Sequence, residues 1–287
     1  MEAPPQSELW PRSNLPLAFY NHPLLPASQF DPLDHLDIVL VSPRNPLNIG
    51  AVARAMANFG FRHLTVVAPY EPHWREAQSA VGAEDLLQNA KVKGTLAEAL
   101  ASATLVFGTG TLDSRKPEQP VVELPALAPI VRDELARSGR VALVFGPEKH
   151  GLTREDLSFC HRLLTIPTDP RQPSMNLGQA VAVCLYELAS RIPHAESPAT
   201  SQPQTEHESA PVFAPDPAAT SSSLDRLVGV IEETIVAAGY SPRSMQTANR
   251  HDLRLLLRRL APNANDIRRI LGLFRRILWR MNRPAAD

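Results

Sequence analysis

Apolar runs and helical patterns alternate along most of the chain. Five continuous apolar stretches predict buried β-strands, at residues 37–42, 63–68, 103–108, 140–146 and 162–166. Residues 48–59 and 176–192 instead carry apolar side chains at helical spacing. Strands that are apolar throughout, with helices between them, indicate a mostly parallel sheet covered on both faces. We therefore predict an α/β domain.

The helix predicted at 48–59 carries one arginine away from its apolar side. Ile49, Val52 and Met56 share one face, and Arg54 lies roughly opposite them at about 100° per residue. The guanidinium of Arg54 therefore points away from the packing face. A surface arginine in an ion pair is the structural alternative to a functional role.

The segments that follow the predicted strands are the expected place for a ligand. In parallel sheets, ligands bind outside the carboxyl ends of the strands. Those segments are residues 42–50, 108–111, 146–151 and 166–176, and their glycines let a ligand approach the backbone closely. None of them has the glycine pattern of a dinucleotide-binding or Walker loop, so neither site is expected.

Several polar residues in these segments have a structural interpretation as well as a functional one. Glu148 lies in a glycine-bounded turn, where a solvated loop acid is the simpler alternative. Ser174 and Asn176 precede a helix, and both are preferred N-cap residues. Thr153 and Asp156 have the spacing of a capping box, so we assign them a structural role.

Cysteine and histidine usage excludes several classes of protein. The two cysteines, Cys160 and Cys184, exclude a disulfide scaffold and a cysteine-based zinc site, and packing is their expected role. The nine histidines show no ligand-like spacing, so no metal site is expected. No apolar run reaches about 18 residues, and the first residues do not resemble a secretory signal. We expect a soluble, cytoplasmic protein without a membrane segment.

Proline is clustered in two places that divide the chain. Seven prolines lie in the first 36 residues, and six more lie between Pro193 and Pro217 among Ser, Thr, Gln and Ala. Such stretches cannot bury enough apolar surface to order themselves. We predict a disordered extension at 1–35, a core domain at 36–193, a flexible linker at 194–222 and a basic helical module at 223–287.

The net charge of −1 hides an uneven distribution. From Leu224 onward the chain has twelve arginines and no lysine against six acidic residues. A local arginine surplus is typical of proteins with a phosphate-rich partner, because guanidinium binds phosphate with two hydrogen bonds. A solvated helix face accounts for the same pattern equally well.

Three segments, taken together, resemble one enzyme family. Residues 48–60 (NIGAVARAMANFG), 143–153 (LVFGPEKHGLT) and 174–187 (SMNLGQAVAVCLYE) are similar, in order and spacing, to motifs of the SpoU (TrmH-like) branch of the SPOUT RNA methyltransferases. The C-terminal segments 255–260 and 266–281 are similar to the helical extension of the TrmJ group, which 2′-O-methylates a ribose in the tRNA anticodon loop. Met175 stands where leucine is usual, a near volume-conserving difference. The proline-rich N-terminal stretch is not part of the family pattern.

The resemblance implies a fold and a methyl donor. It implies a SPOUT domain with a deep C-terminal trefoil knot, an exception to unknotted topology, together with a small all-helical C-terminal domain and a homodimer. It also implies that the knot loops bind S-adenosylmethionine, with no metal. The residues at the matching positions are Thr109, Gly110, Thr111, Gly146, Ile166, Ser174, Met175 and Asn176.

By the same resemblance, the reaction is methyl transfer to a ribose 2′-hydroxyl of tRNA, at a cytidine or uridine. The implied catalytic residues are Arg54, Glu148, Ser174 and Asn176. Arg54 is either the base or an anchor for the adjacent phosphate, since guanidinium rarely loses its proton. The implied RNA-binding residues are Arg54, Arg115, Arg258, Arg259, Arg268 and Arg269.

Other functions fit the same residues. The substrate could be ribosomal RNA, or the methylated group could be a base rather than a ribose. A knotted RNA-binding protein without catalysis is the alternative from another class. The joint presence of Arg54, Glu148, Ser174 and Asn176 argues against that last alternative, because a protein that only binds RNA would not need all four.

Overall fold

The computed structural model describes residues 31–110, 117–192, 217–240 and 242–282. Most of the predicted extension (1–35) and linker (194–222) lies outside these ranges. The described part of the extension contains a 3₁₀ turn, η1 (Pro32–His35), capped by the side chain of Asp31. The described end of the linker contains Thr220, which caps the helix that begins at Ser221.

A parallel sheet forms the centre of the fold, as the sequence predicts. The described strands pair in the order β3-β2-β1-β6-β4-β7-β5, and every pairing between them is parallel. Their bounds are β1 (Leu36–Val41), β2 (His63–Val67), β3 (Lys91–Lys93), β4 (Leu105–Thr109), β5 (Val121–Glu123), β6 (Val141–Phe145) and β7 (Arg162–Thr165). All five predicted strands are present, and their ends agree with the predicted ends to within two residues.

The sheet contains two edge strands that the sequence analysis missed, β3 and β5. Each has three residues, and both residues flanking Val92 in β3 are lysines. A strand this short and polar has no apolar run that could reveal it. Lysines on an edge strand also discourage pairing with another sheet.

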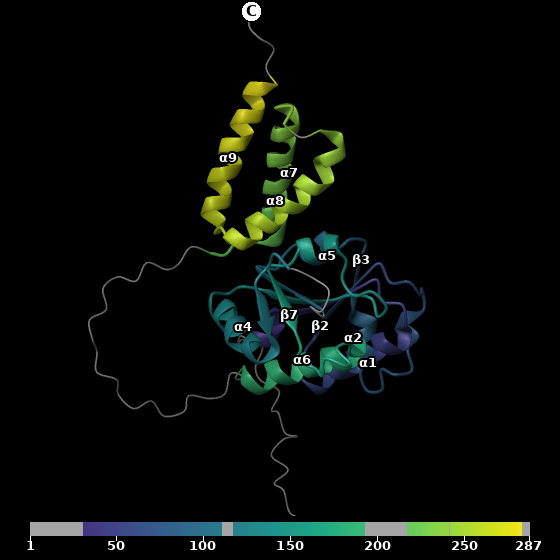
Figure 1. Cartoon of the computed structure of the whole chain (residues 1–287). Helices are drawn as coiled ribbons and strands as arrows, with labels where there is room; N and C mark the ends of the chain where they lie inside the picture. Colours follow the sequence, from purple (N-terminus) through teal and green to yellow (C-terminus); the bar gives the residue numbers. More distant parts are fainter. Residues whose placement is uncertain (1–30, 111–116, 193–216, 241, 283–287) are drawn as a thin grey trace, which may run out of the picture. The chain divides into compact units, whose positions relative to one another are not determined.

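Both faces of the sheet are buried by helices, which explains why its strands are apolar throughout. Along β1, Leu36, Ile38 and Leu40 enter the larger hydrophobic cluster, whereas Val39 and Val41 enter a second one. Helices α1 (Pro46–Asn58), α2 (Glu84–Asn89), α4 (Leu127–Ala136) and α6 (Leu177–Arg191) contribute to the first cluster. Helices α3 (Leu96–Ala99) and α5 (Arg154–Ser158) contribute to the second. Figure 1 shows α1 and α6 side by side under the sheet.

Helices α1 to α6 cover the sheet and are interspersed with its strands along the chain. Two short 3₁₀ turns lie between them, η2 (Trp74–Glu76) and η3 (Leu124–Ala126). The predicted capping box is confirmed: Thr153 and Asp156 cap α5 reciprocally. Helices α1 and α6 approach closely because Gly178 has no side chain, and a Cβ there would lie 2.8 Å from the Cβ of Ala51.

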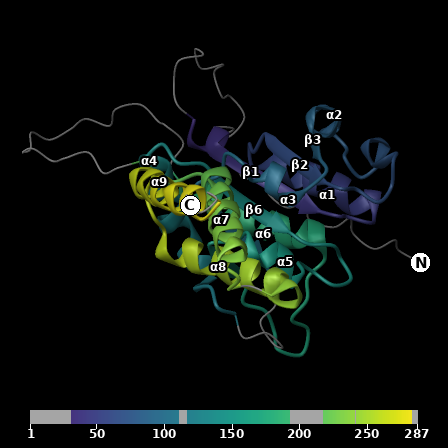
Figure 2. The same ribbon diagram turned by 90° about the horizontal axis from the view of Figure 1, so that it is seen from above.

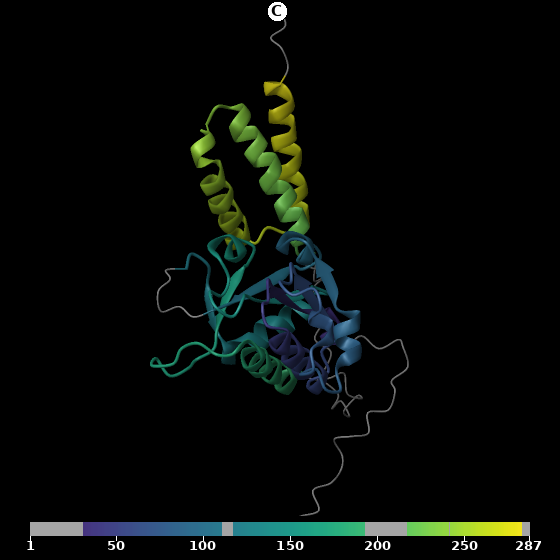
Figure 3. The ribbon, with the colours of Figure 1, turned by 90° about the vertical axis from the view of Figure 1, so that its right-hand side faces the viewer.

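Three longer helices follow, separated from α6 by residues outside the described ranges. They are α7 (Ser221–Ala237), α8 (Gln246–Leu260) and α9 (Ala264–Met281), with a 3₁₀ turn, η4 (Arg243–Met245), before α8. Helix α7 packs against both α8 and α9, as Figures 2 and 3 show. Leu224, Leu227, Leu257 and Ile267 belong to a hydrophobic cluster separate from the two clusters of the sheet.

The structure confirms the packing role predicted for the cysteines. Cys160 and Cys184 are both free thiols and fully buried. Burial raises the pKa of each thiol to about 12, so both stay protonated near neutral pH. No helix among the described residues is long and apolar enough to span a membrane.

Candidate active site at the carboxyl ends of the strands

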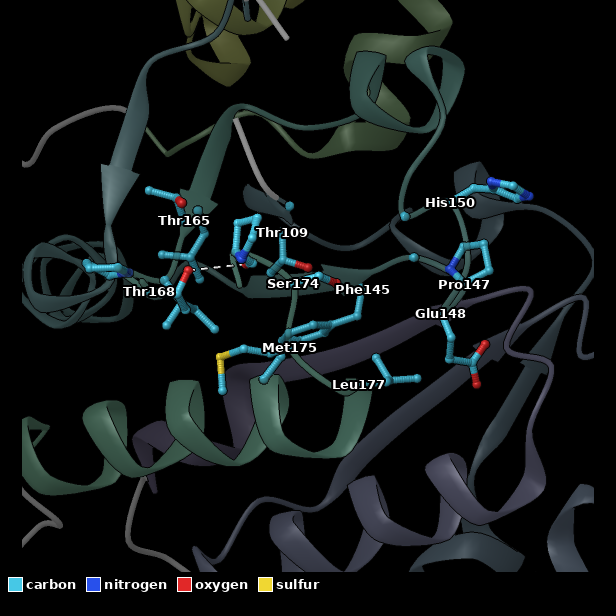
Figure 4. Close-up of a pocket in the computed structure, with 18 of the residues that line it drawn as sticks. Thr109, Phe145, Pro147, Glu148, His150, Thr165, Thr168, Ser174, Met175 and Leu177 are labelled. Carbon is cyan, nitrogen blue, oxygen red and sulfur yellow. Dashed lines mark hydrogen bonds between the residues drawn. The ribbon is translucent and has the colours of Figure 1, made fainter. Parts of the chain in front are cut away.

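A cavity of about 480 Å³ opens at the carboxyl ends of β4, β6 and β7. This volume is typical of a small-molecule site. Three loops surround the cavity: the one after β4, the one from β6 to α5, and the one from β7 to α6. In Figure 4, Thr165 and Thr168 lie on one side, Glu148 and His150 on the other, and Ser174 and Met175 between them.

The walls of this cavity combine apolar surface with a few hydroxyl groups. Phe145, Leu164, Ile166, Met175 and Leu177 supply apolar surface. Hydroxyl groups come from Thr109, Thr165, Thr168 and Ser174. The Thr168 hydroxyl donates to the backbone oxygen of Pro173 at 3.2 Å, which joins two parts of the β7–α6 loop. Such a lining suits a ligand that has both a flat apolar part and polar groups.

Gly146 is required by the shape of its own loop. A Cβ at this position would lie 2.3 Å from the backbone of both Gly151 and Leu152. The loop therefore folds back on itself directly after β6, which brings residues 146–151 to the cavity. Close approach of a ligand is not needed to explain this glycine.

Glu148 fastens the β6–α5 loop to the segment before α1. Its carboxylate accepts hydrogen bonds from the backbone N–H groups of Arg44 and Asn45, each at 3.1 Å, and from the Asn48 side chain at 2.9 Å. Partial burial raises the pKa of Glu148, but these hydrogen bonds outweigh burial and hold the pKa below its usual value. Glu148 is therefore an ionised clamp between two loops.

Asn176 continues this connection to the third motif segment. Its side-chain oxygen caps α6 by accepting from Gly178 N–H at 2.9 Å, which confirms the N-cap interpretation. Its side-chain nitrogen donates to the Asn48 side chain at 2.9 Å. Glu148, Asn48 and Asn176 thus join the segments 48–60, 143–153 and 174–187 by side-chain hydrogen bonds. Sequence reasoning missed Asn48, although it lies in the first motif.

Arg54 is exposed on α1, opposite the buried face, as predicted. No described residue pairs with its guanidinium, so the surface ion pair considered above is absent from the described part of the chain. Arg54 does not line the cavity. Its side chain is thus available to a large ligand that approaches from solvent.

The structure brings most of the predicted cofactor residues together. Six of them line the cavity: Thr109, Gly110, Gly146, Ile166, Ser174 and Met175. Asn176 lies just outside it and holds the loop. Thr111 and Arg115 lie outside the described residues. Sequence reasoning missed Phe145, Leu164, Thr165 and Thr168, although all four lie at or just beyond the strand ends where a ligand was expected.

The predicted RNA-binding arginines divide into two groups. Arg259, Arg268 and Arg269 are exposed. The RNA-binding role expected for Arg258 needs a correction. Its side chain is 0% exposed and donates to Phe159 O and to Asp225, at 3.0 Å each. Arg258 therefore cannot contact RNA in this arrangement. Its place on the packed side of α8 gives it a structural role. Among the described residues, no cluster of His, Cys, Asp or Glu could hold a metal ion.

Comparisons with known proteins place this geometry in a family. Residues 35–186 match the model of the SpoU rRNA Methylase family. The chain is 34% identical over 242 residues to the tRNA (cytidine/uridine-2′-O-)-methyltransferase TrmJ of Pectobacterium atrosepticum, covering 84% of this chain and 95% of that one. It is 43% identical over 157 residues to the tRNA (cytidine/uridine/adenosine-2′-O-)-methyltransferase TrmJ of Pseudomonas aeruginosa, where the match covers 54% of this chain and 61% of that relative.

A solved structure agrees with these matches. The crystal structure of TrmJ from Z. mobilis ZM4 superposes with a TM-score of 0.69 at 30% identity, covering 84% of this chain and 98% of that one. The family match covers the sheet, the cavity and all three motif segments. The chain belongs to the SpoU family of RNA methyltransferases, and its similar relatives are of the TrmJ type.

Proposed function

We propose that this protein transfers a methyl group from S-adenosylmethionine to a ribose 2′-hydroxyl of tRNA. The observation that carries the proposal is the hydrogen-bonded set Glu148, Asn48 and Asn176 at the rim of the cavity. This set joins the three family motifs around a cavity of suitable size. The names of the TrmJ relatives support tRNA, and cytidine or uridine, as the target. Within tRNA, we propose the anticodon loop.

The cavity residues fit the methyl donor. We propose that Ile166 and Met175 contact the adenine ring, and that the hydroxyl groups of Thr109 and Ser174 contact the polar parts of the molecule. Loop backbone at Gly110 and Gly146 supplies further donors and acceptors. Bound there, S-adenosylmethionine supplies a methyl group on a sulfonium, a leaving group that needs no metal.

In the transfer, the 2′-oxygen forms a bond to the methyl carbon as the carbon–sulfur bond breaks. The sulfur keeps the electron pair, and the hydroxyl proton leaves to a base or to water. Arg54 is suited to hold the neighbouring phosphate, because its guanidinium is exposed and has no partner among the described residues, and guanidinium groups stay protonated in proteins. We propose that Arg54 anchors this phosphate and orients the hydroxyl, and that Glu148, Ser174 and Asn176 position the loops around it.

We further propose that the loops around the cavity form a trefoil knot and that the protein is a homodimer. The second proposal is supported by exposed apolar side chains on adjacent helices. Leu47 of α1 is 55% exposed, and Val183 and Tyr186 of α6 are 37% and 60% exposed. Tyr186 contacts Phe59, the residue that follows α1, edge to face, which extends the apolar surface from α6 to the end of α1. A second copy of the chain would bury this surface.

We also propose that α7–α9 form a tRNA-binding module that packs against the sheet domain. Their own hydrophobic cluster and the exposed arginines of α8 and α9 support this role. Deleting residues 224–287 should greatly weaken tRNA binding and leave S-adenosylmethionine binding nearly intact. Unchanged tRNA affinity after this deletion would contradict the proposal.

The direct test uses methyl-labelled S-adenosylmethionine and unmodified tRNA, with an Arg54→Ala variant beside the wild type. After digestion of the RNA, the methylated nucleoside is identified by mass. A 2′-O-methyl nucleoside from the wild type, lost in the variant, supports both the reaction and the role of Arg54. Label found only in ribosomal RNA, or on a base, would replace the proposed substrate. No label in any RNA would favour the binding protein without catalysis.

A further inference from the structure

A second cavity, of about 530 Å³, lies at the amino ends of β4 and β7. Thr104 and Leu105 line it at the start of β4, and His161 and Arg162 line it at the start of β7. Its other walls come from α4, from the residues at the start of α7, from the last turn of α8 (Arg258 and Arg259) and from the turn before α9 at residues 261–263. The described residues from Asp31 onward form one compact unit, and this cavity lies inside that unit.

The two cavities occupy opposite ends of the same two strands. The first is lined by Thr109 at the end of β4 and by Thr165 at the end of β7. A strand rises by about 3.3 Å per residue, so the four steps from Leu105 to Thr109 separate the two ends by about 13 Å. The second cavity is therefore distinct from the proposed methyl-donor site but close to it.

Positive charge dominates this second cavity. Arg137, Arg162, Arg258 and Arg259 line it, against the carboxylates Asp133 and Glu134. Glu134 is already engaged, because it accepts a hydrogen bond from the Thr104 hydroxyl. Arg137 and Arg259 are exposed. Their guanidinium groups stay hydrated when the cavity is empty and can turn toward an anion that enters it.

Arg258 lines this cavity as a structural residue. Its Nε donates to Phe159 O and its Nη2 donates to Asp225, and its Nη1 is buried, with no hydrogen-bond partner among the described residues. The hydrogen bonds to a bound anion would therefore come from the exposed Arg137 and Arg259. Burial above all, together with the charges of Arg258 and Arg162, lowers the pKa of the neighbouring His161 to about 3, so His161 is neutral near pH 7 and adds no charge to the cavity.

We propose that this second cavity binds a phosphate group, and that during the reaction it holds a backbone phosphate of the RNA. Phosphate oxygens accept hydrogen bonds from guanidinium groups in pairs, which matches the arginines at the cavity. The RNA part of this inference rests on the proposed function. It adds a contact about 13 Å from the methyl-donor site, so that RNA is held at two ends of the sheet.

The test compares two double variants with equal loss of charge. Arg137→Gln with Arg259→Gln removes two exposed arginines of the cavity. Arg132→Gln with Arg226→Gln removes two exposed arginines on α4 and α7 that do not line it. The first measurement is the melting temperature of the full chain in inorganic phosphate and in chloride of equal ionic strength. We expect phosphate to stabilise the wild type and the control, and to have little effect on the cavity variant.

The second measurement is the affinity for unmodified tRNA at several salt concentrations, with S-adenosylmethionine affinity measured alongside. We expect the cavity variant to bind tRNA about tenfold more weakly, with a salt slope lower by about 0.7–0.9 for each lost phosphate contact. The control should lose much less, and S-adenosylmethionine affinity should not change.

Three other results would change the interpretation of the second cavity. Equal losses of tRNA affinity in both double variants, without phosphate stabilisation, would overturn the proposal in favour of general charge attraction. Phosphate stabilisation with unchanged tRNA affinity would overturn its RNA part and identify free phosphate as the ligand. If no methyl transfer occurs but the cavity variant alone loses tRNA affinity, the proposed function fails while this inference stands.

Discussion

Helices α1 and α8 both carry arginines, and their surroundings give these arginines opposite roles. Arg54 on α1 is exposed, and no described residue pairs with it. Arg258 on α8 is buried, pairs with Asp225 and donates to Phe159 O. A guanidinium that is already bound by protein groups holds elements together, whereas one left in water remains available to an anion from outside. Partners, more than charge, therefore distinguish a structural arginine from a candidate for substrate binding.

The Arg54 side of this comparison predicts the largest effect. Arg54→Ala should lower kcat/KM for RNA methylation by about 10²–10³ while leaving the melting temperature unchanged, because the side chain has no partner to lose within the described ranges of the chain. Arg54→Lys should restore part of the activity, since it keeps the charge but not the planar pair of donors. Steady-state kinetics and thermal unfolding of both variants test this. A fall in melting temperature would contradict the unpaired state of Arg54.

The Arg258 side predicts a large change in stability. Arg258→Ala should lower the free energy of unfolding by about 3 kcal/mol, because it leaves Asp225 and Phe159 O without their partner. Arg259→Ala, next to it but exposed, should change stability by less than about 0.5 kcal/mol. Urea unfolding of both variants measures the difference. Equal unfolding free energies of the two variants would show that the hydrogen bonds of Arg258 do not stabilise the fold.

Glu148 extends the comparison to a carboxylate that is already partnered. Its folded-state pKa lies below the usual value, so its contribution to stability is present above the unfolded-state pKa and is lost as the pH falls through the folded-state pKa. Because the side chain is partly exposed, Glu148→Gln should cost only about 1 kcal/mol at pH 7. Unfolding from pH 3 to 7 should show the wild type and the variant converging at the acid end. A difference in unfolding free energy between the two proteins that stays constant with pH would show that the charge of Glu148 does not stabilise the loops.

Met175→Leu should have the smallest effect. Met175 lines the first cavity, and the exchange nearly conserves side-chain volume. We expect the affinity for S-adenosylmethionine to change by less than about threefold, measured by calorimetry. Met175→Ala is the contrasting variant, because it removes most of the apolar contact and should weaken binding by more than that. Similar affinities for both variants would place Met175 outside the binding surface.

Most of the sheet could be predicted from the sequence because its strands are buried on both faces. Each of the five predicted strands is a continuous apolar run for that reason, as in β1, whose alternate residues enter different clusters. Strands β3 and β5 could not be predicted in this way, since each has three residues at an edge. The rule that ligands bind at the carboxyl ends of parallel strands located the first cavity correctly.

Individual side chains were less predictable, because their roles depend on distant partners. The capping role of Asn176 follows from its position before α6, but its bond to Asn48 spans 128 residues. The burial of Arg258 depends on Phe159, 99 residues away, and nothing in the local sequence distinguishes it from the exposed Arg259. Local patterns thus located the elements, whereas tertiary contacts decided what each polar group does.

The bonds between Glu148, Asn48 and Asn176 have a consequence for protein engineering. A chimera that takes residues 45–60 from a distant relative, without the matching residues 146–153 and 174–179, would separate donors from their acceptors at the rim of the cavity. The three segments form one transplantable unit, although they are far apart in the chain. Designs that recombine this enzyme with others should exchange them together and leave the intervening strands and helices native.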